Sequence, residues 1–155
     1  MNRPSFQEIY AQMARLVSAR STCKRLQVGC LLVSSDYSQI YSIGYNGSAR
    51  KLSNDSCRAD QPSSCGDIHA EANCLIKCTI KDPNKICFVT SSPCEICAKM
   101  LINSGISAVY YLDEYRDSTG LDILREALVP IYQLVPARDE NNWNYMKVVP
   151  KFRNS

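Results

Sequence analysis

Short β-rich segments alternate with segments of helical composition from residue 68 onward, and this alternation constrains the fold more than any other feature of the sequence. The expected elements are helices over 68–78, 94–103 and 121–128 and strands over 86–90, 108–112 and 131–135. Because parallel strands need long crossover connections, which helices commonly supply, the pattern predicts a partly parallel sheet with helices on both faces. The expected fold class is α/β.

A helix and a hairpin are expected ahead of this alternation. Ser5 and Glu8 have the spacing of a helix capping box, and apolar residues repeat at helical spacing over 6–19. Two β-rich segments, 27–33 and 40–45, flank a polar turn, as in a β-hairpin. These segments add two antiparallel strands to the predicted sheet.

The length of 155 residues suits one domain, since single domains commonly hold about 100–200 residues. We expect it to cover residues 1–155, with a core over about 5–135 and a C-terminal tail over 136–155. No apolar run approaches the length of about 20 residues that a membrane-spanning helix needs. The N-terminus lacks the basic and apolar segments of a secretory signal. We therefore expect a cytoplasmic protein without a membrane partner.

The charge balance argues against a dedicated nucleic-acid binder. The chain carries 18 Lys and Arg against 15 Asp and Glu, a net charge of +3, without the clustered basic residues that nucleic-acid binding requires. A small anionic ligand is compatible with this balance.

Nine cysteines are the unusual feature of the composition. In a reducing cytosol, metal binding or catalysis is a better interpretation of such a set than a disulfide framework. Cys30 and Cys87 lie inside apolar runs and are more simply interpreted as small buried hydrophobic residues. The other cysteines remain candidates for chemistry.

Two short motifs together indicate a zinc site. His69-Ala70-Glu71 is followed, 25 residues after His69, by Cys94 and Cys97 in a Pro-Cys-x-x-Cys motif. One His and two Cys are three zinc ligands, which leaves the fourth tetrahedral position to water, as in catalytic sites. Glu71 then has the position of a general acid and base, and the combined pattern is typical of zinc nucleobase deaminases. The alternative is a closed structural site with another cysteine as the fourth ligand and a solvated Glu71.

These motifs belong to a wider match over residues 20–135. It includes Arg20-Ser21-Thr22-Cys23, Gly44-Tyr45-Asn46-Gly47-Ser48, Val89-Thr90 and Glu114-Tyr115. With them, the sequence resembles the zinc-dependent cytidine deaminase superfamily and, within it, the deoxycytidylate (dCMP) deaminases of phages and bacteria. The resemblance implies a three-layer α/β/α domain with a five-stranded mixed sheet.

The resemblance also implies an activity: hydrolytic conversion of dCMP to dUMP and ammonia, which supplies dUMP for thymidylate synthesis. A zinc-generated hydroxide attacks C4, and Glu71 carries protons from the water to N3 and to the departing amino group. The resemblance implies that the Ala70 amide holds the pyrimidine O2 and that a carbonyl beside Pro93 accepts a hydrogen bond from the amino group. Asn46 is implied to bind the deoxyribose. The alternative for Asn46 is a turn residue of the Asn-Gly type.

Phosphate recognition, by the same resemblance, draws on residues around the 5′ end of the substrate. They are Ser21, Thr22, Lys24, Arg25 and Tyr115. Hydroxyl groups and a guanidinium suit phosphate oxygens. The alternative for Lys24 and Arg25 is a solvated, charged turn ahead of the first strand.

The aperiodic segment 46–67 is long for a loop in a compact domain, and such loops are usually functional. Some relatives bind a second, structural zinc in this region, and Cys23, Cys57 and Cys65 are the candidate ligands here, with the fourth ligand unknown. Residues 48–52 lack the Gly-Gly pair that regulated relatives carry, so control by dCTP or dTTP is in doubt. The resemblance further implies a homo-oligomer, such as a hexamer.

Three other functions compete with this interpretation. The zinc motifs are shared by deaminases of tRNA or single-stranded DNA bases and by deaminases of free cytidine nucleosides. The small net charge and the single Trp, at position 143, argue against a nucleic-acid substrate, because such enzymes need a basic groove with stacking aromatic residues. A catalytically inactive zinc-binding module is the weaker alternative, and Glu71 argues against it.

Overall fold

A computed structural model of the protein describes residues 3–61, 65–137 and 146–151. The elements in chain order are α1 (Phe6–Ser18), β1 (Gly29–Val33), β2 (Ile40–Tyr45), α2 (Ala70–Lys77), β3 (Lys85–Ser91), α3 (Glu95–Asn103), β4 (Ile106–Asp113), α4 (Thr119–Glu126), β5 (Ile131–Pro136) and β6 (Met146–Pro150). The predicted alternation of strands and helices is confirmed, with shifts of one or two residues at most ends.

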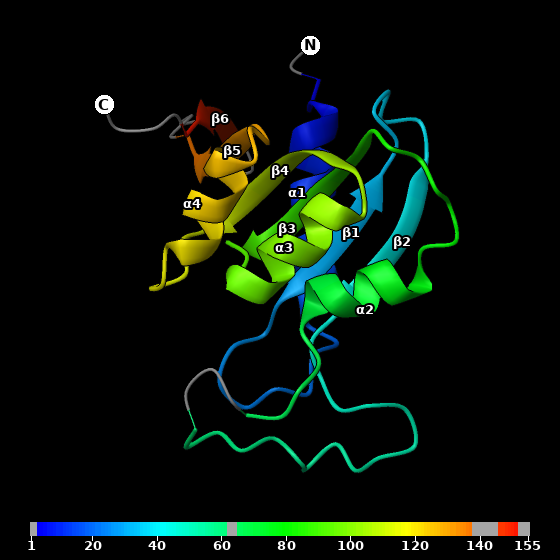
Figure 1. Ribbon diagram of the computed structural model, residues 1–155, viewed down its shortest axis with the longest axis vertical. Helices are drawn as coiled ribbons and strands as arrows, with labels where there is room; N and C mark the ends of the chain where they lie inside the picture. The colour runs from blue at the N-terminus through cyan, green and yellow to red at the C-terminus, as the bar shows by residue number, and fades with distance from the viewer. Residues whose placement is uncertain (1–2, 62–64, 138–145, 152–155) are drawn as a thin grey trace.

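The strands form one mixed sheet in the order β2-β1-β3-β4-β5-β6 (Figure 1). β1 is antiparallel to both β2 and β3, and β3, β4 and β5 run parallel to one another. The carboxyl ends of the three parallel strands therefore meet at one edge of the sheet. Open α/β sheets place their ligands outside this edge.

The sheet has six strands, and the expected number of five was wrong. β6 comes from the segment expected to be a tail, and it pairs antiparallel with β5 through contacts such as Val148 with Leu134. The pairing satisfies backbone groups along β5 that would otherwise lie at the sheet edge. Trp143, which the sequence places just before this strand, lies outside the described residues.

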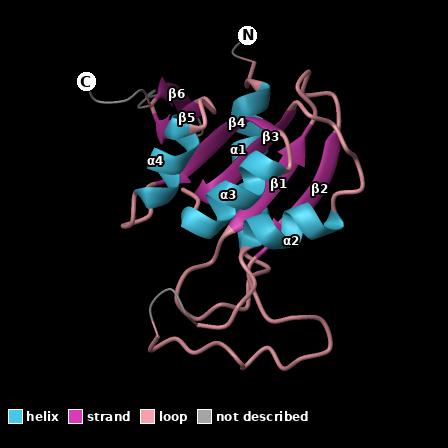
Figure 2. Ribbon diagram, viewed as in Figure 1, coloured by secondary structure: helices cyan, strands magenta, loops and turns pink. Residues whose placement is uncertain are grey.

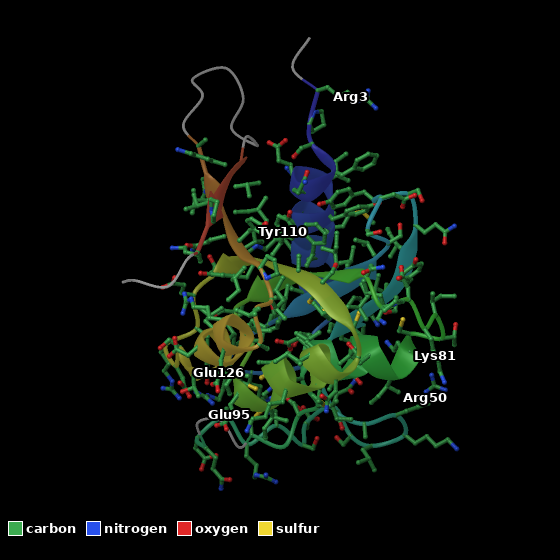
Figure 3. All side chains as sticks on the ribbon, turned by 45° about the horizontal axis from the view of Figure 1, so that its top comes forward. Arg3, Arg50, Lys81, Glu95, Tyr110 and Glu126 are labelled. Atoms are coloured by element: carbon green, nitrogen blue, oxygen red, sulfur yellow. The ribbon has the colours of Figure 1, made fainter. Side chains whose placement is uncertain are left out.

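Helices cover both faces of the sheet and give the predicted three layers (Figure 2). α1 packs on one face, where Tyr10 and Ala14 join a core with Leu31 and Phe88. α2, α3 and α4 cover the other face around Tyr111 and the side chains next to it. In Figure 3, Tyr110 lies on the α1 side of the sheet. Tyr110 and Tyr111 are neighbours in β4, and their side chains pack into the cores on opposite faces of the sheet. This follows from the alternation of side chains along a strand.

Helix α1 begins where the sequence predicts it. The Ser5 hydroxyl accepts a hydrogen bond from the Glu8 N–H at 3.2 Å, and the Ser5 N–H donates to the Glu8 carboxylate at 2.6 Å. Both halves of the capping box are therefore present.

The long loop between β2 and α2 projects beyond the edge of the sheet, beside the connection from α1 to β1 (Figure 1). Its two ends are joined by a β-bridge in which Gly47 and Ile68 exchange hydrogen bonds of 3.1 and 2.8 Å. This bridge fixes the approach of the chain to the first residue of α2. In the part of the chain that the structure describes, no helix is both long and apolar enough to cross a bilayer.

Candidate metal centre and active site

Three side chains meet at the edge of the sheet where β3 ends. The His69 Nδ1 atom lies 3.5 Å from the Cys94 Sγ atom and 3.4 Å from the Cys97 Sγ atom. Zinc–sulfur bonds of about 2.3 Å and zinc–nitrogen bonds of about 2.0–2.1 Å at tetrahedral angles place N and S ligands roughly 3.5–3.6 Å apart. The donor set and its spacing therefore fit a zinc ion.

Two helix starts bring these ligands together. His69 is the N-cap residue of α2 and Cys94 is the N-cap residue of α3, and neither side chain caps its own helix. Cys97 follows in the first turn of α3. The positive end of each helix dipole favours thiolate sulfur at this place. Both side chains at the N-caps thus remain available for a metal.

The cysteine pair is unequal in acidity. The pKa of Cys94 is lowered to about 4, chiefly because the Cys97 thiol donates a hydrogen bond to its thiolate and also because His69 lies beside it. The pKa of Cys97 is raised by its hydrogen bond with Cys94 and by burial. The pKa of His69 is raised, first by its hydrogen bond with Cys94. Metal binding at this site must therefore release a thiol proton.

Glu71 lies in the first turn of α2, behind the three ligands. Its side chain is only 4% exposed, and burial raises the pKa of its carboxyl group because the charged form loses water. A carboxyl group of raised pKa can both accept and return a proton near neutral pH. Glu71 does not belong to the group of potential metal ligands whose atoms lie within 4.8 Å of one another, which consists of His69, Cys94 and Cys97.

A cavity of about 520 Å³ opens onto these groups, and its volume suits a small organic molecule. It is bounded by the start of α2, the start of α3 and the connection after β4. Residues at its wall include Asn46, Ala70, Glu71, Ser92 and Tyr115.

A second group of potential ligands lies beside the cavity. The side chains of Cys23, Cys57, Cys65 and Asp67 offer ligand atoms that all lie within 4.8 Å of one another. Cys23 and Cys57 Sγ atoms are 3.8 Å apart, and the Cys65 thiol points toward the Asp67 carboxylate at 3.7 Å. The structure thus brings the three predicted cysteines together and adds Asp67, which was not among the predicted ligands. The signal in the sequence that could have identified Asp67 as a ligand is its position, two residues after Cys65 and two before His69.

Asn46 is held by the backbone of the connection between α1 and β1. Its Oδ1 atom accepts hydrogen bonds from the Ser21 hydroxyl at 2.6 Å and from the Val28 N–H at 2.8 Å. Its Nδ2 group donates to the Leu26 carbonyl at 2.7 Å. Asn46 is therefore a rigid part of the cavity wall, and one amide hydrogen is left over after the Leu26 bond.

The five residues expected near the substrate phosphate have different environments. Arg25 and Tyr115 line the cavity, whereas Ser21, Thr22 and Lys24 lie outside its lining. The Arg25 guanidinium donates to the Gln61 carbonyl at 3.4 Å from an exposed position.

Ser21 and Lys24 have partners elsewhere in the fold, and Thr22 has none among the described residues. The Ser21 hydroxyl binds Asn46, and the Lys24 ammonium lies 3.9 Å from the Asp55 carboxylate. The buried Thr22 hydroxyl has no hydrogen-bond partner within the described parts of the chain. Of the five residues expected near the phosphate, only Arg25 and Tyr115 therefore line the cavity.

Comparison with known proteins gives a family. The family model for the cytidine and deoxycytidylate deaminase zinc-binding region matches residues 4–113. The sequence is 32% identical to the deoxycytidylate deaminase of Mycobacterium phage D29, over 74% of this chain and 99% of that protein. It is also 32% identical to the deoxycytidylate deaminase of Schizosaccharomyces pombe, over 86% of this chain.

Solved structures agree with this match. The dCMP deaminase from the cyanophage S-TIM5, solved in complex with dCMP and dUMP, superposes with a TM-score of 0.77 at 32% identity. The superposition covers 86% of this chain and 99% of that one. By contrast, the chain spans only 45% of the Schizosaccharomyces pombe protein.

Proposed function

The chain belongs to the cytidine and deoxycytidylate deaminase family, and from this premise we propose that it hydrolyses dCMP to dUMP and ammonia, supplying dUMP for thymidylate synthesis. The observation that carries the proposal is one cavity that contains a zinc-ligand set and a buried glutamate. The cyanophage enzyme solved with dCMP and dUMP supports the choice of substrate.

His69, Cys94 and Cys97 hold the catalytic zinc in this proposal. A zinc ion bound there supplies a Lewis acid that lowers the pKa of water toward about 7. The three ligands line the cavity and would hold the ion there, and the two helix starts hold the ligands. Three protein ligands leave one coordination position open, as catalysis requires.

Glu71 moves the protons. Its buried carboxylate accepts a proton from the attacking water and passes it to N3 of the pyrimidine. The oxygen of this water bonds to C4, and Glu71 then takes the remaining proton from the resulting C4 hydroxyl and delivers it to the amino nitrogen. The bond from C4 to that nitrogen breaks, so that dCMP and water become dUMP and ammonia. The raised pKa of Glu71 suits it to both steps, because the carboxyl group must alternate between its two protonation states.

Backbone and amide groups of the cavity orient the base and sugar. The Ala70 N–H donates to the pyrimidine O2, and a carbonyl beside Pro93 accepts from the amino group. Asn46 uses its remaining amide hydrogen on the deoxyribose, and its rigid attachment supports this role. Arg25 and Tyr115 receive the phosphate, with Ser21, Thr22 and Lys24 supporting the same region from outside the lining.

A second zinc ion is held by Cys23, Cys57, Cys65 and Asp67 and attaches the long loop to the rest of the domain. Four donors within 4.8 Å support this assignment. Metal analysis of the purified protein tests it: we expect two zinc ions per chain and one in Cys57→Ser. One zinc per chain in the wild type, with these cysteines reactive as free thiols, would contradict it.

The proposal extends to assembly, regulation and location. We expect a homo-oligomer such as a hexamer in light scattering, as the resemblance implies. Control by dCTP or dTTP is in doubt, because residues 48–52 lack the Gly-Gly pair of regulated relatives, and the rate with and without each nucleotide tests it. We place the protein in the cytoplasm, where its nine free cysteines stay reduced.

Ammonia release from four substrates tests the proposed function. The zinc-loaded protein is given dCMP, deoxycytidine, dCTP and a short single-stranded DNA in parallel. We expect dCMP to have the highest kcat/KM by at least about a hundredfold, because two or three charged hydrogen bonds to phosphate contribute about 1.5–3 kcal/mol each. Equal values for dCMP and deoxycytidine would indicate a general cytidine deaminase, activity on DNA a nucleic-acid enzyme, and no activity on any of the four an inactive zinc-binding module.

A further inference from the structure

Two segments of the chain meet at the rim of the cavity, and one serine hydroxyl joins them. Ser92 lies between the end of β3 and the Cys94 turn and is only 3% exposed. Its N–H donates to the Asp113 carbonyl at 2.9 Å, and its hydroxyl accepts a hydrogen bond from the Tyr115 N–H at 2.7 Å. The turn that carries a zinc ligand is thereby attached to the connection that carries Tyr115.

The connection between β4 and α4 needs such an attachment because most of it faces solvent. Residues 116–118 are exposed, whereas Tyr115 is half-buried and lines the cavity. The Arg116 guanidinium lies over the Tyr115 ring, 5.9 Å from its centre. The hydrogen bond to Ser92 fixes the backbone at Tyr115, and a fixed backbone determines where the phenol hydroxyl can reach.

The far end of the same connection is fixed on the same turn. Gly120, in the first turn of α4, approaches Pro93 and Cys94 so closely that a β-carbon there would overlap them. Tyr115 is therefore held between two contacts with the segment 92–94. The fold therefore fixes the position of Tyr115 relative to the zinc ligands. A fixed position is what a site needs to recognise a 5′-phosphate at a set distance from the pyrimidine C4.

We propose that Ser92 is a positioning residue for phosphate recognition: its hydroxyl holds the Tyr115 backbone so that the Tyr115 side chain meets the 5′-phosphate of the substrate. The inference depends on the proposed function, since it needs a nucleotide substrate. The Ser92 side chain acts on the phosphate only through Tyr115, so its removal should affect substrates with a phosphate and spare those without one.

Selectivity for dCMP over deoxycytidine, measured as the ratio of the two kcat/KM values, tests the proposal. Ser92→Ala removes the acceptor, and we expect the ratio to fall by about tenfold, the effect of losing one phosphate contact of about 1.4 kcal/mol. The loss should appear in KM for dCMP with kcat nearly unchanged, because binding energy for the phosphate is lost. Ser92→Cys keeps a side chain of similar shape with a weaker acceptor and should shift the ratio in the same direction.

A double-mutant cycle separates positioning from a general structural effect. In a Tyr115→Ala background, Ser92→Ala should leave the ratio unchanged, since the group that it positions is already absent. Ser34→Ala is the matched control. Ser34 is a buried serine whose hydroxyl accepts from the Gln39 N–H at 3.0 Å, at the opposite end of the sheet. It should cost similar stability and leave the ratio unchanged.

Three results would overturn the inference while the proposed function stands: an unchanged ratio in both folded Ser92 variants, additive effects of Ser92→Ala and Tyr115→Ala, or equal losses on dCMP and deoxycytidine. A wild-type protein that shows no preference for dCMP would contradict the proposed function and this inference together.

Discussion

Replacing Gly120 with alanine should favour the helix through its higher helix propensity but disturb the packing next to the zinc site. Gly120 lies in the first turn of α4, and a β-carbon there would overlap the Pro93 carbonyl oxygen and lie 2.8 Å from the carbonyl carbon and oxygen of Cys94. Carbon atoms in ordinary contact are about 3.5–4.0 Å apart, and the overlap with the Pro93 oxygen is closer still, so α4 and the Cys94 turn must separate by roughly 1 Å or more.

The two effects have opposite signs. Alanine normally stabilises a helix interior by about 0.5–1 kcal/mol relative to glycine, whereas overpacking a close contact costs about 1–3 kcal/mol. We expect Gly120→Ala to lower the free energy of unfolding by about 0.5–2 kcal/mol, the difference between the low ends and between the high ends of these ranges. Because a displacement of about 1 Å can cost 100-fold in rate, we expect kcat/KM for dCMP to fall by about 10- to 100-fold.

Denaturant unfolding followed by circular dichroism gives the stability, and ammonia release gives kcat/KM. Glu126→Ala is the control, because Glu126 is an exposed residue at the other end of the same helix (Figure 3). It should retain zinc, stability and activity. A Gly120→Ala protein that is more stable than the wild type and fully active would refute the packing argument.

Three other variants or conditions each test a single feature of the site or the core. Arg25→Ala should lower kcat/KM for dCMP by about tenfold and scarcely change the poor rate on deoxycytidine; equal losses would remove Arg25 from phosphate binding. Cys97→Ala should lose the zinc of the His69 site and with it all activity, and elemental analysis that finds full zinc in an active variant would remove Cys97 from the ligands. Burial raises the pKa of Tyr110 and of Tyr111 well above the usual tyrosine value of about 10, so stability should hold below pH 10 and fall as pH rises above it, because the unfolded chain releases these protons first. Absorbance of tyrosinate should show both groups still protonated in the folded protein when exposed tyrosines have begun to titrate, and early titration of all tyrosines without unfolding would contradict this.

Periodicity and ligand types predict much of the arrangement from the sequence. The capping box of Ser5 and Glu8 marks the start of α1 because it is a local interaction within four residues. His69 and Cys94 can be grouped from the sequence alone, since both lie at predicted helix starts next to strands of one sheet. Helix starts after parallel strands meet at one edge, so the spacing along the chain carries spatial information.

Other features depend on contacts that no local pattern encodes. β6 is a short segment among polar residues, and it becomes a strand because β5 offers an unpaired edge. Asp67 is one of several acidic residues near the long loop, and only the path of that loop brings it to the three cysteines. Ser21 has the hydroxyl expected of a phosphate ligand, yet its partner is the Asn46 side chain 25 residues away. Long-range pairing decides each of these cases.

The central claim is that a zinc site and Glu71 together deaminate dCMP, and the most direct test compares the wild type with Glu71→Gln under identical zinc loading. The wild type should convert dCMP to dUMP with release of ammonia. The Gln variant should keep its zinc content and its unfolding curve but lose about 10²- to 10⁴-fold in kcat, because an amide cannot carry the proton. Near-normal turnover by Glu71→Gln, or no dUMP from a zinc-loaded wild type, would contradict the account.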